Sequence, residues 1–431
     1  MNVVTRLAPD QVGLRRDSRQ LLSSLVVMLA IATGAPSNIR ANSSGAAPDS
    51  PTGGVYLPGS EPLGPKEMRV IALGTGMPSI TRAQAAASFL VQLGNGENFI
   101  FDIGTSALTN LASLGISWKT VDKVFLGHLH FDHMGDLAAL LIVGVSHGRN
   151  KPLRIWGPTG ETDVLGTRYA IDHLMKAYTW EFLSKRGRVP SAGYTPIVEE
   201  FDYTKVQTIY DENGVRIKSW PAIHVIDGPV SFSLEWEGLK FVYSSDTYPN
   251  RWFVDNARNA DIVIHEAFPT VKQLVEFNGM LPESAWPVGT RVHTQPAAAG
   301  KVFSMVQPRM AIAYHFINEV RTRQAIFSEI RSTYDGPVSL AEDLMVWNVT
   351  AEAITTRKAA PIETIWPGKG RLEGAKVNPA ERSFASDWLE GGRLDMSSVD
   401  RAMWMQLDEP TRSRITERLP EVGRQLETPS P

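Results

Sequence analysis

The run 128–136, His-Leu-His-Phe-Asp-His-Met-Gly-Asp, constrains this chain more than any other segment. It follows a short apolar stretch and contains three of the chain's nine histidines. In an extended segment alternate side chains share a face, so His128 and His130 point the same way. If the chain then turns, Asp132 and His133 approach the same small volume from the other side. Imidazole nitrogens and carboxylate oxygens suit zinc, with manganese or iron as alternatives, so the run predicts a site for two metal ions.

The composition is that of a globular protein without cysteine chemistry. The chain has 431 residues, of which 43% are hydrophobic and 21% charged, and this is ample for a buried core. Its net charge of -3 gives no reason to expect nucleic acid, because proteins that bind the phosphate backbone usually carry a basic surplus. Cysteine is absent, which excludes disulfides and the zinc sites that use thiolates.

Both ends of the chain differ from its centre. Arginines at 15, 16 and 19 precede an apolar core over 21–32, which is shorter than the ~20 residues that a membrane-spanning helix needs. We therefore predict a signal peptide over 1–41, and a periplasmic or secreted mature protein with no stable membrane span. Residues 42–67 are rich in Ser, Gly and Pro and are predicted to be a linker. Residues 359–431 contain no histidine and are predicted to be a C-terminal extension.

Between these ends, over 68–358, strand and helix signals alternate and predict one α/β domain. Helices are expected over 106–114 and 136–145, the second with Asp136 as its N-cap. The segment of about 159–211 is less regular, with one helix over 163–183, and we expect it to be an inserted helical cap. Strands are expected over 69–73, 88–93, 98–103, 121–126, 214–220, 230–236, 239–244, 260–264 and 310–314.

Several of these strands are followed directly by a polar residue. Side chains at strand ends converge on one edge, which is where α/β layers usually place active sites. His147 and His173 do not fit this pattern and are treated as surface or packing residues. The histidines that do fit are His128, His130, His133, His224, His265, His293 and His315.

The motif order resembles that of the metallo-β-lactamase superfamily. His-x-His-x-Asp-His is followed by His224, by Asp246 in Ser-Asp-Thr, by His-Glu-Ala and by a last His. The fold that this implies is an αββα sandwich, here with an inserted helical cap and a C-terminal extension. The segments 242–247, 265–267 and 293–300 resemble motifs of the ribonuclease Z branch. Residues 220–224 are also similar to an exported hydrolase of this fold that is assigned to the guanitoxin pathway.

The resemblance implies a ligand set for two divalent cations, with zinc favoured and manganese or iron as alternatives. It further implies a hydroxide that bridges the ions and acts as the nucleophile. One ion would be held by His128, His130 and His224, the second by Asp132, His133 and His315, and Asp246 would bridge the two.

The resemblance also implies three catalytic residues. Asp132 would orient the hydroxide and accept its proton, and His265, supported by Glu266, would protonate the leaving group or stabilise developing charge. The alternative for His265 is an orienting role behind the ligands. For His293 a pocket contact and a structural role in its loop both remain open.

One feature of the ribonuclease Z pattern is missing. In the bacterial proteins a long flexible arm that grips transfer RNA separates the residues matching His224 and Asp246, whereas here 225–245 holds only a pair of strands. Together with the net charge and the predicted export, this makes a small-molecule substrate the expected partner, and nucleic acid is not expected. A homodimer is left open.

Three hypotheses follow. The leading one is a binuclear metal hydrolase of a small ester, phosphoester, sulfate ester or lactone. The alternative is a phosphodiesterase or nuclease of the ribonuclease Z type that acts on nucleic acid. The third, a metal-binding protein without activity, is weakest because Asp132, His265 and Glu266 accompany the ligands. A β-lactamase in the narrow sense is less favoured, since the bridging ligand is an Asp and no Cys ligand exists.

Overall fold

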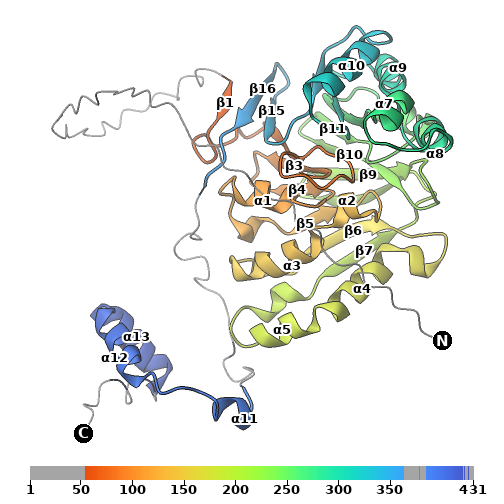
Figure 1. Ribbon diagram of the computed structural model, residues 1–431. Helices are drawn as coiled ribbons and strands as arrows, with labels where there is room; N and C mark the ends of the chain where they lie inside the picture. The colour runs from red at the N-terminus through yellow and green to blue at the C-terminus, as the bar shows by residue number, and fades with distance from the viewer. Residues whose placement is uncertain (1–53, 364–377, 379–384, 421, 423–425, 427–431) are drawn as a thin grey trace, which may run out of the picture. The chain divides into compact units, whose positions relative to one another are not determined.

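The computed structural model describes residues 54–363, 378, 385–420, 422 and 426 (Figure 1). The predicted signal peptide over 1–41 lies outside the described residues, as does the first part of the predicted linker. Among the residues that are described, no helix is both long enough and apolar enough to cross a membrane.

Two mixed sheets form the centre of the fold. Within the described ranges the first sheet, in spatial order, contains β1 (Val55–Tyr56), β16 (Ile354–Ala359), β15 (Met345–Val349), β2 (Met68–Gly74), β3 (Ser88–Leu93), β4 (Asn98–Phe101), β5 (Lys123–Phe125), β6 (Arg154–Pro158) and β7 (Ile197–Phe201). The second contains β14 (Val338–Leu340), β13 (Met310–Tyr314), β12 (Ile262–Glu266), β11 (Leu239–Tyr243), β10 (Val230–Trp236), β9 (Val215–Pro221) and β8 (Gln207–Glu212).

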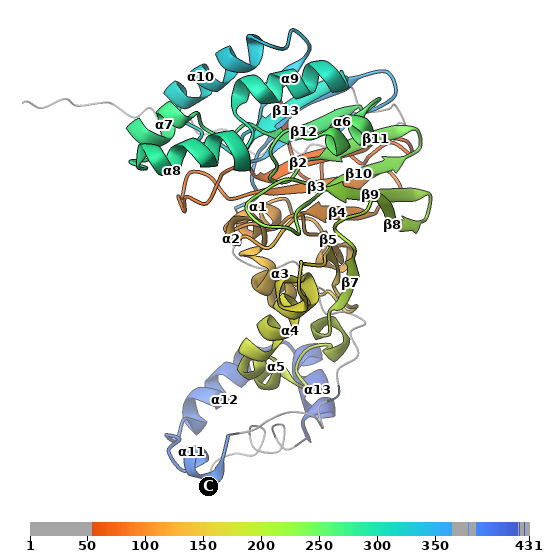
Figure 2. The ribbon, with the colours of Figure 1, turned by 90° about the vertical axis from the view of Figure 1, so that its right-hand side faces the viewer.

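Helices cover the outer face of each sheet (Figure 2). α1 (Ala107–Ala112), α3 (Leu137–Ser146) and α4 (Thr167–Ala177) pack on the first sheet, and α6 (Arg251–Ala257), α9 (Pro296–Val306) and α10 (Val320–Arg331) pack on the second. The remaining helices are α2 (Phe131–Met134), α5 (Thr179–Lys185), α7 (Val271–Glu276), α8 (Pro282–Pro287), α11 (Asp387–Glu390), α12 (Ser397–Gln406) and α13 (Glu409–Arg418).

Helices, first sheet, second sheet and helices form four layers, and apolar side chains fill the three spaces between them. The layer between the sheets is aromatic, with the rings of Phe101 and Phe241 from opposite sheets 5.0 Å apart. The outer layers bury the inward faces of the helices against the two sheets. Strands buried on both faces read as apolar runs in the sequence, which is why the runs at β3 and β13 were identifiable. The expected αββα sandwich is confirmed.

The expected helical cap needs correction. Within 159–211, β7 pairs in parallel with β6 at the edge of the first sheet, and β8 pairs with β9 at the edge of the second. The single helix expected over 163–183 is instead a 3₁₀ turn followed by α4 and α5, because Gly166 and Tyr178 leave the helical conformation. The segment therefore extends both sheets rather than forming a separate cap.

Three other expectations can be compared with the structure. Part of the predicted linker is structured, since β1 pairs in parallel with β16. Asp136 does precede α3 but makes no capping hydrogen bond, and its Oδ2 accepts from the amide of Leu108 at 2.9 Å. The stretch 225–245 does contain the expected pair of strands, β10 and β11, joined by a tight turn at Glu237 and Gly238.

Candidate metal centre

The predicted ligands meet at one edge of the stacked sheets. Each lies just past the end of a strand, except for Asp132 and His133, which lie on the short helix α2. The predicted ligands fall into two separate sets, and within each set all ligand atoms lie within 4.8 Å of one another. The first set contains His128, His130 and His224. The second set contains Asp132, His133, Asp246 and His315.

The first set consists of three imidazoles. His130 Nδ1 lies 3.0 Å from His128 Nε2 and 3.1 Å from His224 Nε2. Burial lowers the pKa of all three, that of His224 to about 4, so the rings are neutral as metal ligands must be. Three nitrogens bound to one tetrahedral zinc at about 2.1 Å stand roughly 3.4 Å apart, close to this arrangement. His130 is exposed, so this set is open to solvent.

The second set is wholly buried. His133 Nε2 lies 3.2 Å from Asp246 Oδ1, and His315 Nε2 lies 3.1 Å from Asp132 Oδ2. Burial opposes protonation of His133, but the carboxylates of Asp246, Asp102 and Asp132 outweigh it and raise its pKa well above the usual range. Burial likewise raises the pKa of Asp132, but His133 and His315 outweigh it, so this pKa is lowered.

Asp246 lies between the two sets. Its Oδ2 is 4.0 Å from His128 Nε2 and 3.9 Å from His224 Nε2, on the side of the first set. Its Oδ1 faces His133 and His315 in the second set, at 3.2 and 3.4 Å. Each carboxylate oxygen therefore faces one set, which is the geometry of a bridging ligand.

Unpartnered atoms show that the site fits metal. Asp246 Oδ1 and His133 Nε2 are both buried, and neither has a hydrogen-bond partner among the described residues. A buried polar atom without a partner is costly and usually marks an ion or water. Nitrogen and carboxylate donors in this arrangement suit divalent cations, and the residues present could hold them.

Behind the ligands, Asp102 holds His133 in place. Its Oδ2 accepts from His133 Nδ1 at 2.7 Å, from the Tyr243 hydroxyl at 2.7 Å and from Ser245 Oγ at 3.0 Å. Ser245 Oγ also lies 3.2 Å from His128 Nδ1 and so contacts a ligand of the other set. Asp102 was not among the predicted site residues, although it directly follows the buried apolar strand β4.

A second carboxylate, Glu266, contacts a histidine at the edge of the centre. Its Oε2 lies 2.8 Å from His293 Nδ1, and its Oε1 accepts from the Thr247 amide at 2.5 Å. Burial and the charge of Asp246 raise the pKa of Glu266 well above the usual range, while burial lowers that of His293. The His293 ring is stacked on Phe268 at 3.8 Å. The choice left open for His293 is resolved in favour of a place in the site.

His265 requires a correction. It is fully buried, but its ring contacts Phe253 and Phe303 in the helical layer behind the second sheet. Its Nδ1 bonds to the carbonyl of Glu266 at 2.8 Å. Side chains alternate along a strand, so when Glu266 points into the site its neighbour must point away. The geometry does not support the predicted catalytic role of His265.

The two histidines set aside in the sequence analysis lie elsewhere. The ring of His147 is 5.4 Å from that of Trp118, and its Nδ1 bonds to the carbonyl of Val143. His173 stacks on Tyr169 in α4. Neither belongs to a group of potential ligands in the described part of the chain.

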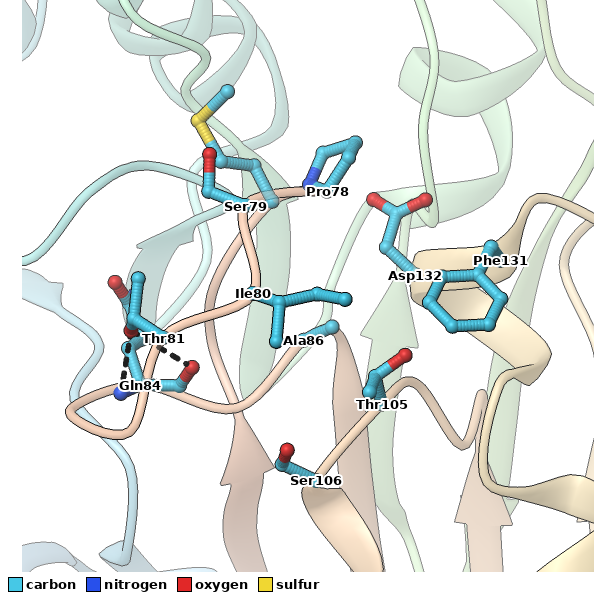
Figure 3. A pocket seen from close by; sticks show the side chains of 11 residues that line it. Pro78, Ser79, Ile80, Thr81, Gln84, Ala86, Thr105, Ser106, Phe131 and Asp132 are labelled. Carbon is cyan, nitrogen blue, oxygen red and sulfur yellow. Dashed lines mark hydrogen bonds between the residues drawn. The ribbon is translucent and has the colours of Figure 1, made fainter. Parts of the chain in front are cut away.

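A hollow about the size of one water molecule, near 10 Å³, lies beside Asp132 (Figure 3). Asp132 and Phe131 face Ile80 and Ala86 across it, and Thr105 and Ser106 lie at one end. The side chains of Ile80 and Phe131 are largely exposed. Two exposed apolar side chains therefore border this hollow.

Comparison with known proteins agrees with this geometry. The model of the family "Anti-Pycsar protein Apyc1" matches residues 68–275. Ribonuclease Z of Mycobacterium marinum is 28% identical over 232 residues, which cover 51% of this chain and 80% of that protein. Ribonuclease Z of Mycobacterium sp. strain KMS is 26% identical over 282 residues, covering 64% and 94%.

Among solved structures, the metallo-β-lactamase fold protein YhfI from Bacillus subtilis is similar in fold. The match has a TM-score of 0.50 at 18% identity and covers 66% of this chain and all of YhfI. The stacked sheets and the His and Asp centre together define a metal-dependent hydrolase of the metallo-β-lactamase fold. Within that superfamily the chain is similar in sequence to ribonuclease Z proteins.

Proposed function

We propose that the protein is a phosphodiesterase that works with two divalent cations, with zinc the favoured metal and manganese or iron as alternatives. The observation that carries the proposal is the position of Asp246, whose two oxygens face two separate ligand sets. Sites with two ions about 3.5–4 Å apart recur in phosphatases and nucleases, where they stabilise the attacking and leaving oxygens of an in-line displacement.

The choice of a phosphodiester over other esters rests on the relatives. From the sequence, a small ester is the leading hypothesis for the substrate, and a phosphodiesterase of the ribonuclease Z type is the alternative. The curated relatives that this chain matches over most of their length are named ribonuclease Z, which supports the second hypothesis. Nucleic acid was not expected from the sequence, and the relatives now make a ribonucleotide phosphodiester the proposed substrate class.

The residues around the centre have distinct roles in this reaction. The cations supply a water made nucleophilic near neutral pH and neutralise charge on the phosphoryl oxygens. Asp132 lies beside His133 and His315, which lower its pKa, so it is ionised and accepts the proton that the attacking water loses. Asp102 keeps the His133 ring oriented through Nδ1.

His293 is placed to protonate the leaving oxygen. The raised pKa of Glu266 keeps this carboxyl protonated, so it donates to His293 Nδ1. His293 Nε2–H would then give its proton to the departing alkoxide while Nδ1 takes the proton of Glu266. Stacking on Phe268 and the contact between Glu266 and the Thr247 amide limit movement of the pair. The need for such a donor is greatest with a poor leaving group such as a ribose hydroxyl.

The test compares leaving groups and ester types. We expect metal-loaded protein to hydrolyse bis-p-nitrophenyl phosphate faster than the matched aryl sulfate, acetate or lactone, and also to cleave a dinucleotide. Asp246→Ala should abolish both activities together with metal binding. Fast sulfate or carboxylate ester hydrolysis without cleavage of any phosphodiester would overturn the proposal and restore the small-ester hypothesis.

A further inference from the structure

A second hollow, of about 270 Å³, adjoins the metal centre through His224. Its walls come from three places: the β7–β8 connection with Tyr203 and Thr204, the loop 222–228 that follows β9, and Trp252 at the start of α6. His224 belongs to this lining and also to the first ligand set. A group bound in this hollow would therefore be next to a phosphate held at the centre.

The size and the apolar surface of the hollow suit one ring system. Pockets for whole ligands usually measure ~300–1,000 Å³, so this one is large enough for a fragment of a substrate. Ile223, Val225 and Ile226 in the same loop are exposed by 38, 58 and 59%. Exposed apolar residues gathered at a hollow are typical of a surface that a ligand covers.

The polar group that best defines the ligand is Asp227. Its Oδ2 accepts a hydrogen bond from the Tyr203 hydroxyl at 3.3 Å, which orients the carboxylate. Asp227, Glu161 and Asp202 all act on Tyr203 electrostatically, and Lys205 pairs with Asp202 at 2.9 Å. The negative charge of Asp227 in the lining disfavours a second phosphate in this hollow and favours a group that presents N–H donors.

We infer that this hollow is a subsite for a nucleobase that carries an exocyclic amino group, with Asp227 as the acceptor of its N–H. The inference rests on the proposed function, because it assumes that the phosphate of the same substrate lies at the metal centre. Carboxylates read amino-bearing bases in the same way when proteins bind nucleic acid. Asp227 would then determine specificity without contacting the reacting atoms.

The test uses pairs of substrates that differ by one amino group. The p-nitrophenyl 5′-phosphodiesters of guanosine and inosine form one pair, and those of adenosine and purine riboside form another. We expect kcat/KM to favour the amino-bearing member of at least one pair by about tenfold, mainly through KM. Asp227→Ala should bring that ratio close to one. The matched control is Glu352→Ala, which removes the same charge from the exposed β15–β16 turn and should keep the ratio.

The outcomes separate this inference from the proposed function. If diesters are hydrolysed but neither pair is discriminated, the subsite is wrong and the phosphodiesterase stands. If no diester is hydrolysed, the function fails, and calorimetry with the corresponding 5′-monophosphates then tests the subsite through the same ratio in Kd. A preference for p-nitrophenyl phosphocholine that Asp227→Ala removes would instead show a cation site and overturn the inference.

Discussion

Asp102 accepts the Nδ1 hydrogen of His133 at 2.7 Å, and this contact connects the aromatic layer between the sheets to the metal centre. The same carboxylate accepts from the hydroxyl of Tyr243, which in turn accepts from the hydroxyl of Tyr314 at 3.1 Å. These residues come from β11, β13 and the end of β4. The orientation of one ligand ring is thus set by how the two sheets pack.

Replacing Asp102 should weaken metal binding without unfolding the protein. Asp102 has a positive φ of 55°, a conformation that Asn also tolerates, so Asp102→Asn keeps the backbone and removes the charge. Loss of such an orienting carboxylate typically costs 10–100-fold in metal affinity or activity, and we expect about that loss here. Titration with zinc against a competing chelator measures it. An unchanged affinity would mean that Asp102 only packs.

His293 and His265 should respond oppositely to substitution. His293→Ala removes the proton donor, so kcat on a poor leaving group should fall by roughly 10²–10⁴-fold while two ions remain bound. The loss should be smaller with p-nitrophenolate, which departs without a proton. His265→Leu fills a buried site beside Phe253 and Phe303 and should keep both metal and turnover. Steady-state kinetics with metal analysis of each variant checks this pair, and loss of turnover in His265→Leu would contradict the assignment.

Removal of the metal should abolish activity and also destabilise the domain. Without ions, buried atoms such as Asp246 Oδ1 and His133 Nε2 make no hydrogen bond among the described residues. A ligand present at about a hundredfold above its Kd stabilises the folded state by about 2.7 kcal/mol per site. We expect a chelator to lower the melting temperature, and zinc or manganese to restore both the temperature and the activity. Full activity in a metal-free preparation would refute the mechanism.

Gly104 should tolerate no side chain. A Cβ at this position would lie 2.0 Å from the main-chain oxygen of Asp132 and 2.8 Å from the Cβ of Ala86, so α2 would have to move. A shift of about 1 Å at reacting groups can cost around 10²-fold in rate. We expect Gly104→Ala to lose activity and one metal ion, measured by kinetics and metal content. Gly54→Ala, where nothing lies within 4 Å, is the matched control and should behave as the parent.

The Arg154–Glu212 pair should give a pH-dependent contribution to stability. Arg154 on β6 bonds both oxygens of Glu212 on β8, at 3.0 and 2.9 Å, and so links the first sheet to the edge strand of the second. These hydrogen bonds lower the pKa of Glu212, so the stabilisation is complete above its ordinary pKa of about 4.3 and is lost as the pH falls through the lowered value. Because both side chains are partly exposed, we expect Glu212→Gln to cost only about 0.2–1 kcal/mol at neutral pH.

Urea unfolding of the parent and of Glu212→Gln at a series of pH values checks this sign. The difference in the free energy of unfolding should shrink as the pH is lowered from about 7 toward 3.5. A difference that grows on acidification would show that the pair does not act through the charge of Glu212.

Much of the fold and of the ligand set could be predicted because the signals are local. Runs such as 88–93 and 230–236 are buried on both faces and bounded by turns, so their limits follow from the residues themselves. β7 and β8 were missed because edge strands are half exposed and polar, as in the sequence Ile-Val-Glu-Glu-Phe of β7. Only the sheets beside them explain why these segments are extended.

The sequence prediction gave the catalytic role to His265, whereas the structure favours His293, and this error has a different cause. Ile262 and Ile264 face the layer between the sheets and Val263 faces the helices, so the alternation along β12 already requires His265 and Glu266 to point to opposite sides. That signal was present in the sequence. The place of His293 was not, because it follows an irregular π-helical segment over Val288–Val292 whose path depends on tertiary packing.

The positions of the metal ligands and of the second hollow differ in one respect that matters for how such a protein changes over time. The ligands are fixed by sheet packing and by close approaches such as that of Gly104 to Asp132. The wall of the hollow over 225–227 is an exposed loop that carries none of that packing. Substitutions in this loop can change which substrate is bound while the metal ligands stay in place. Proteins that share this centre can therefore diverge in substrate specificity and keep the same hydrolytic reaction.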